Sequence, residues 1–273
     1  MKKLILLLLF FPGMLCAREV SVDNPLDLFN AIAPNTTIIL APGDYNFSVL
    51  DENASTDYAK FSYGELIITG VRNLTLRGEG YAECGTEDPY SNVFRFVQCE
   101  GIILDNLVMG HFIEKGYCEG SVLSFDQSSS IEVKNSVMYG SGTYGIQAFG
   151  VEGLEVTDCV VKDCSYGTLF LSDVKNVEFR NTQFKRCQSG IAIQGSSKLI
   201  LFSDCYFTGI KDYQEWAKWN KDAQFLFSFG DEVESVLLKN NRFDRNSTKD
   251  LLSSDSAVTV KGSTGTGNTF NLD

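Results

Sequence analysis

Apolar and polar residues alternate in short segments that recur along the middle of the chain. Ile131–Lys134 has apolar residues at its first and third positions, and Leu154–Thr157 and Val177–Arg180 repeat this pattern at intervals of 23 residues. Further segments of this kind begin at Ile102, Leu199 and Val236. A period of two indicates a β-strand that buries one face. Because the spacing of amphipathic helices is missing, the repeat predicts a solenoid of stacked β-coils.

Two columns of turn residues accompany these strands. Asn and Asp tolerate the left-handed backbone of a sharp turn, and their side chains can bond from coil to coil. The residues that follow the strands therefore predict a stacked ladder: Asn106, Asn135, Asp158, Asn181 and Asn240. A second corner is marked by Gly120, Gly145, Gly167 and Gly190. The pattern predicts an all-β fold, a single-stranded right-handed parallel β-helix with coils of about 22–29 residues.

The start of the chain predicts an exported protein with a capped solenoid. Residues 1–17 combine a basic start, an apolar run too short to span a bilayer and a small residue at Ala17, as in a signal peptide. Residues 18–273 then form a single domain that is secreted or periplasmic and has no membrane insertion. Asn24 and Pro25 are typical of a helix start, so 24–33 is expected to form an N-terminal capping helix, followed by a first strand at Thr37–Leu40.

Composition limits the possible partners. The chain carries 23 basic and 35 acidic residues, a net charge of −12, which disfavours nucleic acid and anionic membranes as partners. No Cys or His spacing of the zinc type occurs, so we expect neither a metal nor a cofactor, and we expect a monomer. Cys164 and Cys187 lie one predicted coil apart, where they could form a disulfide or remain thiols.

Two stretches resemble pectate-lyase-like right-handed β-helix proteins of secreted bacterial type. They are Leu28–Ile32 with Thr37–Tyr45, and Gly110–Gly120 continuing to Tyr139–Ile146. The resemblance implies the fold, but this architecture serves lyases, hydrolases, epimerases, adhesins and scaffolds. Lyases of this fold typically place aspartates around calcium with an Arg or Lys base, and the hydrolases use an Asp-Asp pair. Neither arrangement maps onto this chain.

Residues suited to catalysis or binding occur at one position of the repeat. This is the tenth residue, counted from the first residue of each strand segment: Ile102, Ile131, Leu154 and Val177. His111, Gly140, Asp163 and Arg186 share this position, so they are expected to line one ridge, with Lys162 and Lys185 beside it. His111 could act as a general base, with Glu114 and Glu119 of the same loop as its carboxylate partners, while Asp163 and Arg186 would contact substrate. The alternative is that His111 only satisfies backbone groups.

Aromatic residues provide a second indication of glycan binding. Tyr139, Tyr144 and Tyr166 fall near coil corners, and Trp216 and Trp219 lie in an insertion at 210–223. Such rings can stack on sugars, or they can pack against the solenoid wall. The sequence thus predicts a β-helix that binds or processes an extracellular or cell-envelope polysaccharide, as a lyase- or hydrolase-like enzyme if catalytic. The alternative is a non-catalytic scaffold or protein-binding module.

Overall fold

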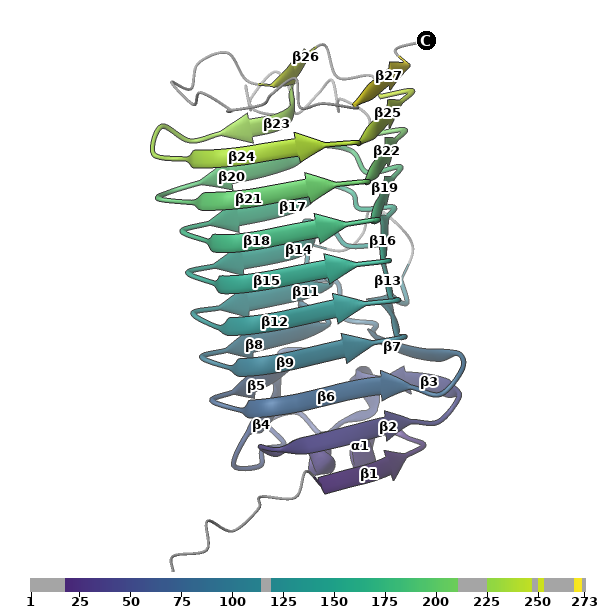
Figure 1. Cartoon of the computed structure of the whole chain (residues 1–273). Coiled ribbons are helices and arrows are strands. Elements are labelled where there is room, and N and C mark those ends of the chain that lie inside the picture. The colour runs from purple at the N-terminus through teal and green to yellow at the C-terminus, as the bar shows by residue number, and fades with distance from the viewer. Residues whose placement is uncertain (1–17, 114–118, 211–224, 247–249, 253–267, 272–273) are drawn as a thin grey trace, which may run out of the picture.

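The computed structural model describes residues 18–113, 119–210, 225–246, 250–252 and 268–271. The described strands form three sheets of nine strands each, stacked coil upon coil (Figure 1). Each regular coil contributes one strand to every sheet, and the pairing within each sheet is parallel apart from the pair β4–β5. The predicted parallel β-helix is confirmed.

The bounds of the strands follow the chain through the three sheets in turn. Sheet A contains β1 (Arg18–Val22), β2 (Thr36–Leu40), β6 (Arg72–Gly78), β9 (Glu100–Asp105), β12 (Ser129–Lys134), β15 (Glu152–Thr157), β18 (Lys175–Arg180), β21 (Lys198–Ser203) and β24 (Glu234–Lys239). Sheet B contains β3 (Gly43–Asn46), β7 (Ala82–Thr86), β10 (Val108–His111), β13 (Val137–Tyr139), β16 (Val160–Lys162), β19 (Gln183–Lys185), β22 (Tyr206–Thr208), β25 (Arg242–Asp244) and β27 (Thr269–Asn271). Sheet C contains β4 (Ala59–Ser62), β5 (Glu65–Thr69), β8 (Phe94–Val97), β11 (Leu123–Asp126), β14 (Tyr144–Phe149), β17 (Gly167–Ser172), β20 (Ile191–Gln194), β23 (Phe225–Phe229) and β26 (Asp250–Leu252).

The register of sheet A agrees with the sequence repeat, with one shift. Ile131 pairs with Leu154, and Leu154 pairs with Val177. The next partner is Ile200, however, and not Leu199 as predicted from the start of that segment. Leu199 has a left-handed φ of 57° and lies half exposed, which rotates its side chain away from the core.

Stacked aromatic rings fill the C-terminal half of the core. Phe179 lies over Phe202 and Phe184 over Phe207, with ring centroids 4.8 Å apart in each pair. Identical positions of adjacent coils are about 4.8 Å apart, so in-register rings stack face to face. Every coil buries its apolar side chains against those of the neighbouring coils, so the stacked coils share one continuous hydrophobic core.

The polar ladder between sheets A and B is confirmed. Its members have φ between 46° and 55°, and the amide of Asn181 donates to Asp158 in the preceding coil. Asn135 donates instead to Asp105, at 2.8 Å. These side chains lie at the surface, where hydrogen bonds contribute less to stability than in the interior.

Two short elements close the N-terminal end of the solenoid. The predicted capping helix is confirmed as α1 (Pro25–Ala31), whose first turn is capped by Asn24 through a bond of 2.9 Å from the backbone N–H of Asp27. A 3₁₀ turn, η1 (Phe47–Val49), follows β3. The antiparallel strand β4 covers the edge of sheet C, a cap that the sequence repeat did not predict.

Some predictions concern residues outside the described part of the chain. These are the signal peptide at 1–17 and the insertion at 210–223, of which only Ile210 is described. Among the described helices, none is long and apolar enough to cross a membrane. Cys164 and Cys187 are buried thiols, and the pKa of the Cys164 thiol is raised by its hydrogen bond with Cys187 and by burial.

Candidate functional site

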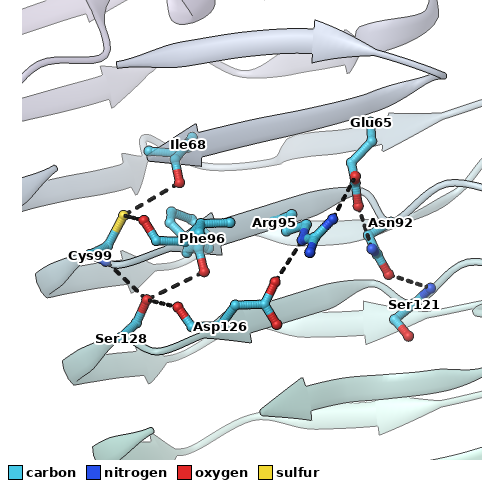
Figure 2. A network of polar contacts seen from close by, with 10 residues as sticks. Glu65, Ile68, Asn92, Arg95, Phe96, Cys99, Ser121, Asp126 and Ser128 are labelled. Carbon is cyan, nitrogen blue, oxygen red and sulfur yellow. Dashed lines mark hydrogen bonds and ion pairs between the residues drawn. The ribbon is translucent and has the colours of Figure 1, made fainter. Parts of the chain in front are cut away.

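A cluster of charged side chains lies on the outer face of sheet C (Figure 2). Arg95 of β8 lies between two carboxylates from the neighbouring strands β5 and β11. Its Nε donates to Asp126 Oδ2 at 2.6 Å, and its Nη1 lies 3.8 Å from Glu65 Oε2. Asn92 donates from its amide to Glu65 and accepts a bond of 3.0 Å from the backbone N–H of Ser121. We call Glu65, Asn92, Arg95 and Asp126 the polar cluster.

The electrostatics of the polar cluster are set by partial burial. The Glu65 side chain is only 12% exposed, and this burial raises its pKa, while bonding to Asn92 and the charge of Arg95 act in the opposite direction. Asp126 raises the pKa of Arg95, so that the guanidinium stays charged. A carboxyl group with a raised pKa beside a fixed cation is a common feature of binding and catalytic sites.

Hydrogen bonds of buried residues hold the backbone beneath the polar cluster. Ser128 donates to the carbonyl oxygen of Asp126 at 3.0 Å and accepts a bond of 3.0 Å from the backbone N–H of Cys99 (Figure 2). Ser128 and Cys99 are both buried. These bonds join two coils at the end of β11, and they therefore hold Asp126 in place relative to Arg95.

An aromatic strip continues the same outer face. Tyr144 lies 5.4 Å from Tyr166 and 5.3 Å from Phe170, and Phe170 lies 5.4 Å from Phe149, measured between ring centroids. Asp126 pairs in register with Phe149, so the aromatic strip begins one coil beyond the polar cluster. The structure thus brings together two of the predicted tyrosines, Tyr144 and Tyr166.

A glycine makes room for one ring of the aromatic strip. Tyr144 pairs with Gly167 in the next coil. A Cβ atom at Gly167 would lie 2.3 Å from the ring of Tyr144. The tyrosine ring therefore rests on bare backbone, and any larger residue at 167 would push it outward.

His111 does not lie on the predicted outer ridge. Its ring is buried at 2% exposure, with Nε2 at 2.8 Å from the carbonyl oxygen of Ser91, and Nδ1 is buried and has no hydrogen-bond partner among the described residues. Burial lowers the pKa of His111. The reason is strand alternation: Met109 points inward, Gly110 outward and His111 inward again. This location favours the structural alternative, and the catalytic role of His111 remains untested.

The other predicted members of that site are separated or undescribed. Glu119 lies exposed at the surface, whereas Glu114 falls outside the described residues, as do Trp216 and Trp219. Asp163 and Arg186 do stack as predicted, because both have a left-handed φ that turns them outward. Arg186 binds Asp163 through two hydrogen bonds of 2.8 and 2.7 Å.

Tyr139 lies at the end of β13, on the outer face of sheet B and not at a corner. A Cβ atom at Gly110 would lie 2.5 Å from its ring, so the ring covers the backbone of the preceding coil. Its hydroxyl donates to Glu83, and Lys162 Nζ lies 5.7 Å from its ring centroid. Burial and Glu83 raise the pKa of Tyr139, so the phenol remains protonated at neutral pH.

A shallow groove of about 690 Å³ follows the outer face of sheet A. Its wall contains both polar and apolar side chains and includes a column of glutamates in consecutive coils: Glu132, Glu155 and Glu178. Lys134 and Arg180 pair with the outer two of these glutamates. Within the described ranges, no group of Cys, His, Asp and Glu side chains has an arrangement that could hold a metal ion.

Sequence reasoning missed the polar cluster. The indication was present in the alternation of Phe94–Val97 and Leu123–Asp126, which are 29 residues apart and place Arg95 and Asp126 outward. Neither segment matches the five-residue repeat of sheet A, and Glu65 lies in the irregular first coils. The charged residues could therefore not be aligned from the repeat alone.

The fold defines the chain as a right-handed parallel β-helix protein. The family model described as "Right handed beta helix region" matches residues 92–233 and again residues 121–272. The chain therefore belongs to the right-handed β-helix family, which confirms the predicted resemblance. No curated protein matches the chain in sequence.

Solved structures share the fold at low sequence identity. An alginate lyase from Paenibacillus sp. str. FPU-7 matches with a TM-score of 0.63 and 10% identity, covering 88% of this chain and 93% of the lyase. The ORF18 protein of Geobacillus virus E2 matches with a TM-score of 0.52 and 8% identity, covering 86% of this chain and 53% of the viral chain. The pectate lyase Pel9A matches with a TM-score of 0.42 and 8% identity, covering 89% of this chain and 74% of the lyase.

Proposed function

We propose that this protein binds a polysaccharide along the outer face of sheet C. The observation that carries the proposal is the contiguity of the polar cluster and the aromatic strip, which occupy successive coils of one face. Sugar rings stack on aromatic side chains, and their hydroxyl groups bond to carboxylate, amide and guanidinium groups. The two groups of side chains together supply both kinds of contact.

The geometry suits a chain that runs along the solenoid axis. Arg95 and Phe170 lie three coils apart in one column, through Ser124 and Gln147. At about 4.8 Å per coil this is roughly 14 Å, a distance that an oligosaccharide of a few units can span. The fold shared with an alginate lyase supports a polysaccharide ligand. Export through the segment 1–17 would place the protein where such polymers occur.

Turnover is a second candidate, favoured by the raised pKa of Glu65. A carboxyl group with a raised pKa is suited to act as a general acid, and Asp126 provides a second carboxylate beside Arg95. Glu65→Gln removes the proton donor while keeping the bond to Asn92. Product analysis with wild type and this variant separates binding from catalysis, since a binding protein releases no shortened chains.

The test of binding uses a chain that begins at Arg18 and isothermal titration against a set of polysaccharides. Tyr144→Ala and Phe170→Ala should each weaken binding by about tenfold, which corresponds to the loss of one stacked ring. Leu237→Ala, an exposed residue on sheet A, is the matched control and should bind as wild type does. Unchanged affinity in the Tyr144→Ala/Phe170→Ala double variant would overturn the site.

A further inference from the structure

Positive charge is concentrated on the outer face of sheet B in its C-terminal half. The strands β16, β19, β22 and β25 and the corners after them carry Lys162, Lys185, Arg186, Arg242 and Arg245. The described residues of the same segments include two carboxylates, Asp163 and Asp244. This excess of three positive charges occurs on a protein whose net charge is −12. Figure 1 shows these strands one above another along one edge of the solenoid.

Both carboxylates form ion pairs with arginines, so they do not neutralise the two lysines. Arg186 binds Asp163 at 2.7 Å, and Asp244 lies 3.2 Å from Arg242. Lys162 and Lys185 pair in register on adjacent strands. In the part of the chain that the structure describes, neither lysine forms an ion pair. Like charges on adjacent strands oppose pairing, so the fold itself gains nothing from this arrangement.

Sheet A contains a second lysine pair in register on adjacent strands. Lys175 and Lys198 are flanked by glutamates in the coils on either side, Glu152 and Glu234. Lys175 binds Glu152 at 2.8 Å. The sheet B pair is flanked instead by Tyr139 and Thr208, which carry no charge. The same solenoid therefore neutralises one lysine pair internally and leaves the other for an external anion.

Aromatic rings stand near both ends of the sheet B pair. Tyr139 precedes Lys162 in register and lies flat on the sheet, with Lys162 Nζ 5.7 Å from its centroid. Tyr206 lies in the column beside Lys185, with the Arg242 guanidinium 5.1 Å from its ring. Along the solenoid axis the two lysines therefore lie between two tyrosines, Tyr139 and Tyr206. The four residues extend over three coil spacings, or about 14 Å. An elongated ligand with anionic groups and flat apolar faces matches this order.

We infer that the outer face of sheet B, centred on Lys162 and Lys185, is a second contact surface that takes an acidic polysaccharide. Carboxylate groups of the polymer bind the two ammonium groups, and sugar rings pack beside the half-buried Tyr139 and Tyr206. The inference rests on the proposed function, because it assumes that the protein binds glycans, and it adds the charge class of the ligand. The net negative charge of the protein repels polyanions elsewhere, so the anionic groups of the polymer bind at this face.

The experiment compares two double variants that remove the same charge at the same one-coil spacing. Lys162→Gln/Lys185→Gln alters sheet B, and Lys175→Gln/Lys198→Gln is the matched control on sheet A. Each is titrated with polygalacturonate and with a neutral glucan at several salt concentrations. We expect the sheet B variant to bind polygalacturonate about tenfold more weakly, with a shallower salt dependence, and to keep wild-type affinity for the neutral glucan. Lys162→Arg/Lys185→Arg should restore binding.

Three outcomes would overturn the inference. The first is an equal loss of affinity in the sheet A control, which would show only the effect of net charge. The second is unchanged binding of polygalacturonate by the sheet B variant. The third is binding of duplex DNA or anionic vesicles through the same lysines in preference to polygalacturonate. Failure of the proposed function is distinguishable, because it appears as unchanged affinity of the Tyr144→Ala/Phe170→Ala variant for every polysaccharide tested.

Discussion

The role of His111 can be tested by replacing its ring with one of similar size. His111→Phe keeps an aromatic ring in the buried position and removes the 2.8 Å hydrogen bond with the Ser91 carbonyl oxygen. A buried carbonyl group left without its partner costs about 1–3 kcal/mol. The free energy of unfolding at pH 7.5 should fall by this amount, and the urea midpoint should decrease accordingly. Polysaccharide affinity should stay unchanged, because the ring does not reach the surface.

The pH dependence provides an independent check on the same residue. Burial lowers the pKa of His111 in the folded protein below its ordinary value of 6.5, so the unfolded chain binds a proton more readily. The stability from neutral His111 is therefore fully present above pH 6.5 and is lost as pH falls below it. Between pH 7.5 and 5.5 wild type should therefore lose more stability than His111→Phe does, as measured by urea unfolding at both pH values. If His111→Phe has wild-type stability but binds no polysaccharide, the structural role of His111 is refuted.

Three further substitutions test the fold by urea unfolding. Phe202→Ala removes a ring stacked 4.8 Å from Phe179 and should lower stability by about 3–5 kcal/mol; a loss below 1 kcal/mol would contradict the stacked core. Leu199→Gly relieves a left-handed φ of 57° at a half-exposed side chain and should raise stability by about 1 kcal/mol, whereas a decrease would show that Leu199 packs usefully. Asn135→Val places a β-branched residue at φ 51° and removes the bond to Asp105, so it should lower stability by about 1–2 kcal/mol, more than Asn135→Gly does.

The outward positions show where prediction of the site from sequence succeeds and fails. Stacking of Asp163 with Arg186 was predictable, because the two are one repeat apart. The inward direction of His111 is also predictable, because it follows from the strand alternation that begins at Met109. The meeting of Glu65 with Arg95 was not predictable, since these residues lie in coils of irregular length where no repeat aligns them.

The sequence by itself determined the solenoid, its register up to the shift at Leu199, the Asn ladder and the capping helix at the N-terminal end. A strand with one buried face allows one register only, because a shift of one residue exposes the whole apolar face, and the 23-residue spacing carries that register from coil to coil. Apart from pairs such as Asp163 and Arg186 that lie one repeat apart, the tertiary structure decided which outward side chains meet across coils. Outward residues have no apolar face to fix their partners, so the contacts of Arg95, Tyr144 and Lys162 depend on coil length, side-chain direction and the glycines beneath them.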